Sequence, residues 1–351
     1  MHSALKTRLL GLCGIDVPIV QTGMGWVAGP SLVAGTANAG ALGILASATM
    51  NFDEMVAAIA AVKAATTRNF GVNLRADAPD AAQRIDHMIA AGVKVASFAQ
   101  APKQDLIKRC KDGGLVVIPS IGAKRHAEKV AAWGVDAVLV QGHEAGGHVG
   151  QVATGILLPQ VVDTVDLPVI AAGGYFDGRG LVSALAYGAA GVAMGTRFLL
   201  SADSAVPDAI KQIYLSKAVG DTVVSTRVDG VPHRVLRTEF VDELEKAGPV
   251  SSLPKAALNA VRFRRLTGLA WRSMIKEGLA MKKSMDLSWS QMLMAANTPM
   301  LLKATMVDGK AEAGVMAGGQ VVGVIDDLPS CAELVARIIA EAEATLHRLG
   351  A

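Results

Sequence analysis

The decapeptide QGHEAGGHVG, residues 141–150, places two histidines and one carboxylate among four glycines. An apolar run, residues 137–140, comes directly before it, so the decapeptide begins where a buried strand should end. The imidazole of histidine has an ordinary pKa of about 6.5 and can exchange protons near neutral pH. We predict that His148 is a catalytic base, with a purely structural role as its alternative, and that His143 is structural.

Three further residues of the decapeptide could contact a ligand. The side chain of Gln141 can both donate and accept hydrogen bonds. Gly146 and Gly147 have no side chain, so a ligand could approach their backbone closely. We predict that all three residues contribute to the binding of a cofactor or another small molecule.

A metal site is the alternative use of this segment, because His143, Glu144 and His148 are all possible ligands. A loop with this many glycines fixes three ligands poorly, and the sequence contains no further ligand cluster, so we predict no metal. The three cysteines are too few and too widely spaced for a disulfide framework or a zinc knuckle. The chain also lacks the G-x-S-x-G nucleophile elbow, which argues against a serine hydrolase.

Eight apolar runs alternate with alanine-rich amphipathic segments between residue 15 and about residue 200. This alternation is typical of βα units, and eight consecutive units predict a (β/α)₈ TIM barrel rather than a doubly wound sheet of five or six strands. In such a barrel the active site lies at the carboxyl ends of the strands. The expected strands are residues 17–21, 42–46, 70–76, 93–99, 115–121, 136–141, 167–173 and 190–195.

Composition and charge narrow the class of protein further. The apolar fraction of 51% with only 4% aromatics suits parallel strands covered by helices. Residues 17–52 carry no charge, but proline and glycine break them into pieces shorter than a membrane-spanning helix, so we predict no membrane association. A net charge of +3 gives no reason to expect nucleic acid. Without a secretory signal at the amino terminus, we expect a cytoplasmic protein with reduced cysteines.

Glycines follow the last two expected strands, where TIM barrels commonly bind phosphate groups. Gly173 and Gly174 come after the seventh strand, and Gly195 and Thr196 after the eighth. Backbone amides at glycine can approach a phosphate closely, so we predict a phosphorylated cofactor, with simple tight turns as the alternative.

Three residues after earlier strands are weaker candidates for the same site. Gly23 and Met24 follow the first strand, where a flat ligand could lie against the backbone. Asn73 ends the third strand and could hydrogen-bond a heteroaromatic edge, although asparagine at a strand end is often only a turn residue.

The pattern of βα units stops after Arg197. We predict a barrel core over residues 1–204, a helical and basic lid over residues 205–310, and a terminal segment over residues 311–351 that ends in a helix packed on the barrel. Residues 255–283 carry eight basic residues and one acid. They could receive phosphate groups or could form a solvated helical face.

The segments QTGMGW, FGVNL, QGHEAGGHVG, AAGGYFDGRG and MGTRFL, in this order, resemble the nitronate monooxygenase family and the related flavin-dependent enoyl-ACP reductases. The resemblance implies FMN in a TIM barrel, with the GGH histidine, His148, as the active-site base. Some relatives have a lysine near the end of the fifth strand where this chain has Ser120, which could still hydrogen-bond the cofactor. The cofactor-binding residues implied in this way are Gly23, Met24, Asn73, Ser120, Gln141, Gly146, Gly147, Ala172, Gly173, Gly174, Gly195 and Thr196.

Two hypotheses for the reaction use the same residues. In the first, the enzyme oxidises alkyl nitronates, with O₂ reoxidising the flavin. The second is a dehydrogenase or reductase for a CoA or ACP thioester, with NAD(P)H as co-substrate. Later segments, such as STRVDGVPHRVLRTEFVDELE, are similar to a branch containing steroid-degradation CoA-thioester dehydrogenases, which favours the second hypothesis. The family as a whole favours the first, so nitronate oxidation is our main prediction and the thioester reaction is its alternative.

The glycine pattern is also compatible with a third class of protein. A flavin-free phosphosugar-binding barrel would explain the glycines after the last two strands, but not QTGMGW or Asn73. The expected partner is a small-molecule substrate, a nitronate or an acyl-CoA, and a homodimer is a possible assembly.

Overall fold

The computed structural model describes residues 1–246 and 298–350. These residues fall into two compact units. The first comprises residues 1–145, 149–205 and 324–350, and the second comprises residues 146–148, 206–246 and 298–323. The three domain boundaries expected from the sequence remain predictions.

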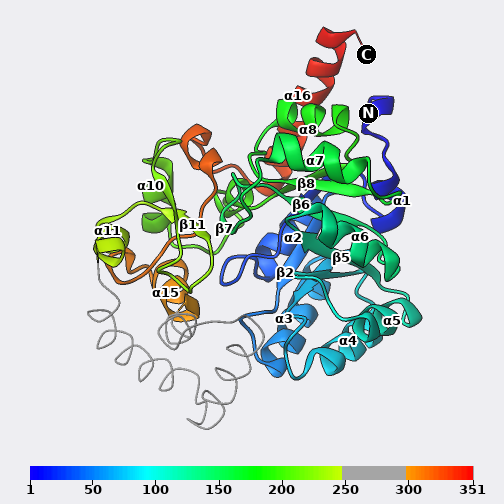
Figure 1. Ribbon diagram of the computed structural model, residues 1–351, viewed down its shortest axis with the longest axis horizontal. Helices are drawn as coiled ribbons and strands as arrows, with labels where there is room; N and C mark the ends of the chain where they lie inside the picture. Colours follow the sequence, from blue (N-terminus) through cyan, green and yellow to red (C-terminus); the bar gives the residue numbers. More distant parts are fainter. Residues whose placement is uncertain (247–297, 351) are drawn as a thin grey trace. The chain divides into compact units, whose positions relative to one another are not determined.

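The first unit contains a closed barrel of eight parallel strands in the order β1-β2-β3-β4-β5-β6-β8-β9 (Figure 1). All eight strands expected from the sequence are present, so the predicted (β/α)₈ TIM barrel is confirmed. Each strand is apolar and almost entirely buried, as expected when helices cover a parallel sheet. The strands are β1 (Ile19–Gln21), β2 (Leu42–Ala46), β3 (Gly71–Leu74), β4 (Val95–Phe98), β5 (Val116–Ile121), β6 (Val138–Gln141), β8 (Val169–Ala172) and β9 (Gly191–Met194).

Helices connect these strands, and local sequence signals begin and end several of them. Asn51 forms a capping box with Glu54 at the start of α3, and Gly14 ends α1 in the left-handed conformation. The helices of this unit are α1 (Arg8–Cys13), α2 (Pro30–Asn38), α3 (Phe52–Ala65), α4 (Ala81–Ala90), α5 (Gln104–Asp112), α6 (Lys124–Ala132), α7 (Thr154–Val162), α8 (Gly178–Ala186), α9 (Thr196–Leu199) and α16 (Cys331–Leu349), with a 3₁₀ turn, η1 (Ser3–Leu5).

The terminal helix α16 packs against α8 and α2, as Figure 1 shows for α8. Ser330 and Glu333 form a capping box at its start. Its buried residues recur at helical spacing and include Leu334, Ile338 and Ala342. This face of α16 therefore packs within the first unit.

The second unit has a three-stranded antiparallel sheet in the order β10-β11-β7, with β10 (Thr222–Ser225), β11 (His233–Leu236) and β7 (Gly147–His148). Its helices are α10 (Asp208–Leu215), α11 (Glu239–Lys246) and α15 (Thr298–Met306), with the 3₁₀ turn η2 (Ala311–Ala313); the turn η3 (Gln320–Val324) ends at its boundary. The sequence indicated helices here and missed β10 and β11, because four residues are too few for a clear alternating pattern. The basic segment 255–283 lies outside the described residues.

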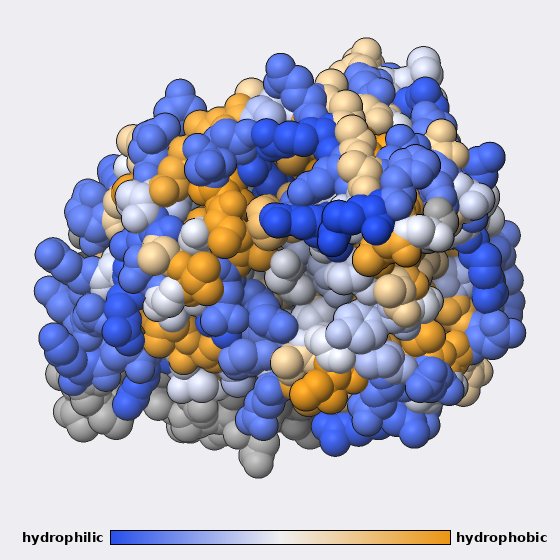
Figure 2. All heavy atoms as spheres, turned by 90° about the horizontal axis from the view of Figure 1, so that it is seen from above, coloured by the Kyte–Doolittle hydropathy of each residue, from blue (hydrophilic) through white to orange (hydrophobic). Residues whose placement is uncertain are grey.

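In the described part of the chain, no helix is both long and apolar enough to span a membrane. On the face shown in Figure 2, hydrophobic residues form several separate patches among hydrophilic ones.

Candidate active site

The carboxyl ends of the barrel strands bring several predicted site residues together. A Cβ placed on Gly23, after β1, would lie 2.5 Å from the Cβ of Asn73 at the end of β3, so these two residues are direct neighbours. Met24 lies beside Gly195, where a Cβ would be 3.4 Å from the methionine sulfur. Residues from β1, β3 and β9 therefore share one edge of the barrel.

The loop after β6 is tied to the loop after β8. The amide of Gly142 donates a hydrogen bond to the carbonyl of Ala172 at 3.0 Å. The hydroxyl of Thr154 lies 3.1 Å from the carbonyl oxygen of Gly173 and 2.8 Å from a carboxylate oxygen of Glu144. Gly173 and Gly174 have φ values of +103° and +83°, a conformation that favours glycine. These contacts hold the predicted phosphate loop in a sharp turn.

The loop after β1 contains a residue that the sequence did not single out. Trp26 is the one non-glycine residue with positive φ, +64°, in the described part of the chain. Such a conformation in a bulky residue costs free energy and is characteristic of functional sites. Its indole Nε1 is buried and has no hydrogen-bond partner among the described residues. The loop after β1 therefore carries a residue in a strained conformation whose buried indole N–H could donate a hydrogen bond to a ligand.

Ser120, half-buried at the end of β5, and Gln141, half-buried at the end of β6, lie on adjacent strands at the same edge of the barrel. Thr196 is buried at the start of α9, directly after Gly195. Gly146, Gly147 and His148 belong to the second unit.

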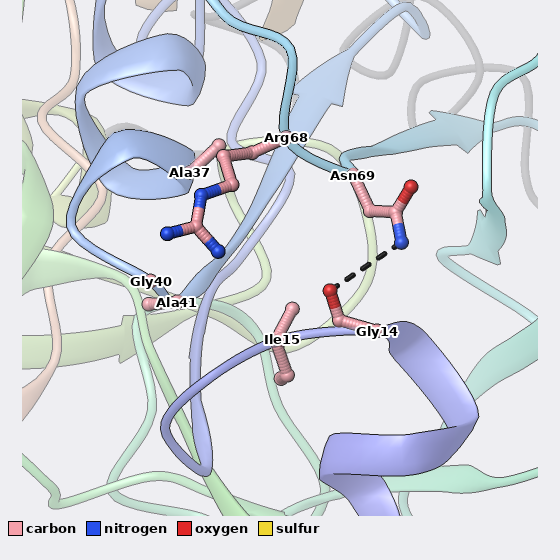
Figure 3. A pocket seen from close by; sticks show the side chains of 7 residues that line it. All are labelled: Gly14, Ile15, Ala37, Gly40, Ala41, Arg68 and Asn69. Carbon is pink, nitrogen blue, oxygen red and sulfur yellow. Dashed lines mark hydrogen bonds between the residues drawn. The ribbon is translucent and has the colours of Figure 1, made fainter.

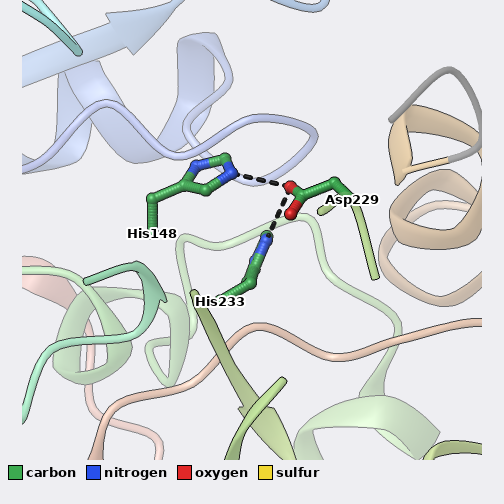
Figure 4. Close-up of side chains that lie close together, drawn as sticks. All are labelled: His148, Asp229 and His233. Atoms are coloured by element: carbon green, nitrogen blue, oxygen red, sulfur yellow. Dashed lines mark hydrogen bonds and ion pairs between the residues drawn. The ribbon is translucent and has the colours of Figure 1, made fainter. Parts of the chain in front are cut away.

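His148 forms a cluster with two residues of the second unit, Asp229 and His233 (Figure 4). Its Nε2 lies 2.6 Å from Asp229 Oδ2, and His233 Nδ1 lies 3.2 Å from the same oxygen. The His148 side chain is 63% exposed, whereas those of Asp229 and His233 are 7% and 4% exposed. A solvent-accessible histidine is thus backed by a buried carboxylate and a second, buried histidine.

The pattern of β-strand pairing explains why residues so far apart in sequence meet. β7 and β11 are antiparallel, and His148 is paired directly with His233, so their side chains lie side by side. Their ring centroids are 4.6 Å apart. The sequence analysis missed Asp229 and His233, although an acid and a histidine four residues apart in DGVPH could have suggested them.

Burial and hydrogen bonding set the charges in this cluster. Burial disfavours the charged carboxylate of Asp229, but hydrogen bonds from His148 and His233 outweigh it and hold its pKa well below the usual value. Burial lowers the pKa of His233, so this ring is neutral near pH 7. The cluster therefore contains a carboxylate and a neutral inner histidine.

The spacing of the cluster, with its three ligand atoms within 4.8 Å of one another, would also admit a metal ion. Both ring nitrogens, however, already lie at hydrogen-bond distance from Asp229 Oδ2, so we interpret the cluster as hydrogen-bonded. The ligand set considered from the sequence has other partners: His143 Nδ1 lies 2.8 Å from the carbonyl of Gly150, and Glu144 binds Thr154.

The opposite edge of the barrel has a structural role. A small hollow there is lined by residues that precede β1, β2 and β3 (Figure 3). Asn69 donates hydrogen bonds to the carbonyl oxygens of Cys13, at 3.1 Å, and Gly14, at 3.4 Å. Arg68 forms an ion pair with Asp16. Polar groups at this edge of a TIM barrel serve stability rather than chemistry.

The cysteines offer no nucleophile. Cys13, Cys110 and Cys331 are free and buried, and burial raises the pKa of each thiol to about 12. All three are therefore neutral thiols at physiological pH.

Comparison with known proteins identifies the family. The nitronate monooxygenase family pattern matches residues 6–341. Two relatives are named (3aS,4S,5R,7aS)-5-hydroxy-7a-methyl-1-oxo-octahydro-1H-indene-4-carboxyl-CoA dehydrogenase. The one from Rhodococcus jostii (strain RHA1) is 60% identical over 99% of both chains, and the one from Mycobacterium tuberculosis (strain ATCC 25618 / H37Rv) is 63% identical over 96% of both.

More distant relatives share about a third of their residues with this chain. A probable nitronate monooxygenase from Staphylococcus aureus (strain MSSA476) is 31% identical and covers 69% of this chain and 81% of its own. The solved structure of FabK from Thermotoga maritima has a TM-score of 0.79 and 32% identity, covering 98% of both chains. The resemblance noted from the barrel motifs is confirmed, and this chain is an oxidoreductase that belongs to the nitronate monooxygenase family.

Proposed function

We propose that this protein is an FMN-dependent dehydrogenase that oxidises a secondary hydroxyl group of a bicyclic CoA thioester to a ketone. The observation that carries the proposal is the identity of 60% over 99% of both chains with a dehydrogenase whose named substrate is such a thioester. In that substrate the hydroxyl-bearing carbon is next to the carbon that bears the thioester. The sequence alone favours nitronate oxidation, whereas the two relatives that are 60% and 63% identical favour the thioester reaction.

The barrel edge fits a flavin. Glycine at position 23 lets Asn73 lie directly against the loop after β1, and the buried indole donor of Trp26 in the same loop lacks a protein partner among the described residues. We propose that Gly23, Met24 and Asn73 lie along the flavin ring and that Ser120 and Gln141 hydrogen-bond it or its side chain. The phosphate would be held by Ala172, Gly173, Gly174, Gly195 and Thr196. Gly146 and Gly147 have no side chains, so a ligand could approach their backbone closely beside His148.

The oxidation removes two electrons and two hydrogens from the substrate. The hydrogen on the hydroxyl-bearing carbon leaves with its electron pair, as a hydride. FMN, when bound, is chemically able to accept a hydride and later pass it to NAD(P)⁺. The hydroxyl proton goes to the imidazole of His148 as the C=O bond forms. Asp229 stabilises the resulting imidazolium through its hydrogen bond at 2.6 Å. In the opposite direction, the same groups would return a proton and a hydride to the ketone.

Nitronate oxidation is the second candidate and is supported by the family relationship and the Staphylococcus relative. There, His148 would take a proton from a neutral nitroalkane or stabilise the bound anion. A cytoplasmic location and a homodimeric assembly remain predictions, as does phosphate binding by residues 255–283.

The proposed reaction is tested by incubating the purified protein with NAD⁺ or NADP⁺ and a bicyclic β-hydroxyacyl-CoA, followed by mass spectrometry of the thioester. We expect a product lighter by two hydrogens. The matched control is the same thioester without the hydroxyl group, which should remain unchanged. Turnover of a nitronate together with no change in the hydroxyacyl-CoA would contradict the proposal in favour of the second candidate.

Trp26→Phe tests the cofactor site. The variant keeps an aromatic ring and removes only the indole N–H, so a lost hydrogen bond to FMN should weaken binding roughly 5- to 10-fold. Titration of the FMN-free protein with FMN, followed by flavin fluorescence, measures the change. Trp133→Phe, at the end of α6, is the matched control. Equal FMN affinity in the Trp26 variant and the wild type would show that the indole N–H does not bind FMN.

A further inference from the structure

We propose that Asp229 and His233 are positioning residues for His148: the Asp229 carboxylate accepts the Nε2 proton of His148, so that Nδ1 of His148 is the atom that exchanges a proton with the substrate. This inference rests on the proposed role of His148 as the base. It assigns a function to two residues that lie outside the family-like barrel motifs, and it specifies a protonation pattern that can be measured directly.

The carboxylate is held in one orientation. Asp229 lies in the turn before β11, followed by Gly230 with a φ of +88°, a conformation that favours glycine. The amide of Val231 lies 3.3 Å from Asp229 Oδ1, while both histidine rings face Oδ2. Each carboxylate oxygen therefore has its own donors, and the group cannot rotate without breaking contacts on both sides.

The charge state of Asp229 decides the tautomers. A carboxylate only accepts hydrogen bonds, so each ring nitrogen that faces Oδ2 must carry a proton. This gives Nε2–H in His148 and Nδ1–H in His233. A neutral imidazole has one N–H, so the lone pair of neutral His148 is on Nδ1 and that of His233 is on Nε2. Nε2 of His233 is buried and has no hydrogen-bond partner among the described residues, as expected for an atom without a proton to donate.

Solvent exposure distinguishes the role of His148 from the roles of Asp229 and His233. The His148 ring is 63% exposed, but Asp229 and His233 are almost fully buried, so among these three only His148 can meet a substrate. Asp229 stabilises the cation that His148 becomes when it takes a proton, as the buried aspartate does in the Ser-His-Asp triad. His233 supplies a second hydrogen bond to Asp229 and packs against the His148 ring, which limits movement of both.

In the part of the chain that the structure describes, few charges outside the cluster act on it. Among the described residues, the charged or titratable groups that influence Asp229 are His148 and His233, and those that influence His233 are Asp229 and His148. The neighbouring Arg234 in β11 directs its guanidinium to Thr222, 2.8 Å away. A change in kcat on removal of Asp229 would therefore report on this cluster.

The first test is the tautomer of each ring, measured by long-range ¹H–¹⁵N correlation on protein labelled with ¹⁵N-histidine. We expect the His233 signal to show a protonated Nδ1 and a bare Nε2, the less common form in water, and neutral His148 to show the reverse. Signals are assigned with His148→Gln and His233→Gln. A His233 ring protonated on Nε2 alone would overturn the inference. So would bound metal that deprotonates Nδ1 of His233, because a metal-bound nitrogen carries no proton.

The second test is kinetic. Asp229→Asn keeps the shape of the side chain and removes its charge, so we expect kcat to fall by roughly 10²- to 10⁴-fold with KM changed by no more than about threefold. Asp208→Asn, an 89% exposed aspartate of α10, is the matched control. Wild-type kcat in Asp229→Asn would overturn the inference.

The two tests separate this inference from the proposed function. The tautomer measurement needs no substrate. The only variants it needs are the two that assign the histidine signals. The kinetic test can be made with whichever substrate reduces the flavin, so a nitronate-oxidising enzyme would still reveal whether Asp229 and His233 position His148.

Discussion

His148→Ala is expected to retain bound FMN and to lose turnover by roughly 10²- to 10⁴-fold, the usual contribution of a positioned general base. The imidazole is 63% exposed and lies on the two-residue strand β7, so the protein should still fold without it, although the buried Asp229 loses one hydrogen bond. The residues proposed to hold FMN at the barrel edge are unchanged in this variant. Turnover and flavin content, measured on the same preparation, separate the two effects.

Two further variants, one at His148 and one at a distant histidine, complete this test. His148→Gln keeps most of the side-chain volume but cannot act as a base near neutral pH, so it should lose turnover to a similar extent. His126→Ala removes an imidazole from the helix α6 of the barrel and should leave turnover unchanged. Wild-type turnover in both His148 variants would exclude acid–base chemistry at this residue.

Gly178→Ala is expected to destabilise the barrel unit by about 3 kcal/mol, as overpacking of a tight contact does. Gly178 begins α8 where it meets α16, and a Cβ there would lie 2.4 Å from the backbone N of Ala342 and the backbone O of Ile338. Backbone atoms of a helix cannot move aside as a side chain can. The amide of Gly178 also donates a hydrogen bond to Glu341 at 2.8 Å, which a shift of α16 would break.

Thermal unfolding measures this effect, and Tm should fall by roughly 6 °C or more. Gly11→Ala is the matched control, because Gly11 lies within α1 and a Cβ there would meet no atom within 4 Å. This control should stabilise the protein by about 0.5–1 kcal/mol, since alanine favours the helix over glycine. An unchanged Tm in Gly178→Ala would contradict the close packing of α8 and α16.

The barrel could be predicted from sequence because its signals are local and repeated. Each strand is a short apolar run followed by an amphipathic helix, and strands buried on both faces leave continuous runs such as LGILA at 42–46. The glycines after β1, β8 and β9 could be found for the same reason, since the chain places them directly at strand ends. That Gly23 is a neighbour of Asn73 could not be predicted, because this contact depends on the register of the strands in the closed barrel.

The histidine cluster could be predicted only in part. His148 was identified from its neighbours in sequence, but Asp229 is 81 residues away and joins it only through a two-residue strand paired with β11. A strand of two residues has no recognisable periodicity, and Gly147 disfavours one. Trp26 was missed because its positive φ opposes the preference of an aromatic residue, so tertiary contacts rather than local sequence must impose it.

The most direct test of the account is the flavin absorbance of the purified protein mixed without oxygen, first with a bicyclic β-hydroxyacyl-CoA and then, separately, with an alkyl nitronate. We predict rapid bleaching by the hydroxyacyl-CoA, recovery of the colour on addition of NAD⁺ or NADP⁺, and slow or no bleaching in His148→Ala. Bleaching by the nitronate alone would contradict a thioester dehydrogenase, and a protein that binds no flavin at all would contradict the proposed cofactor site.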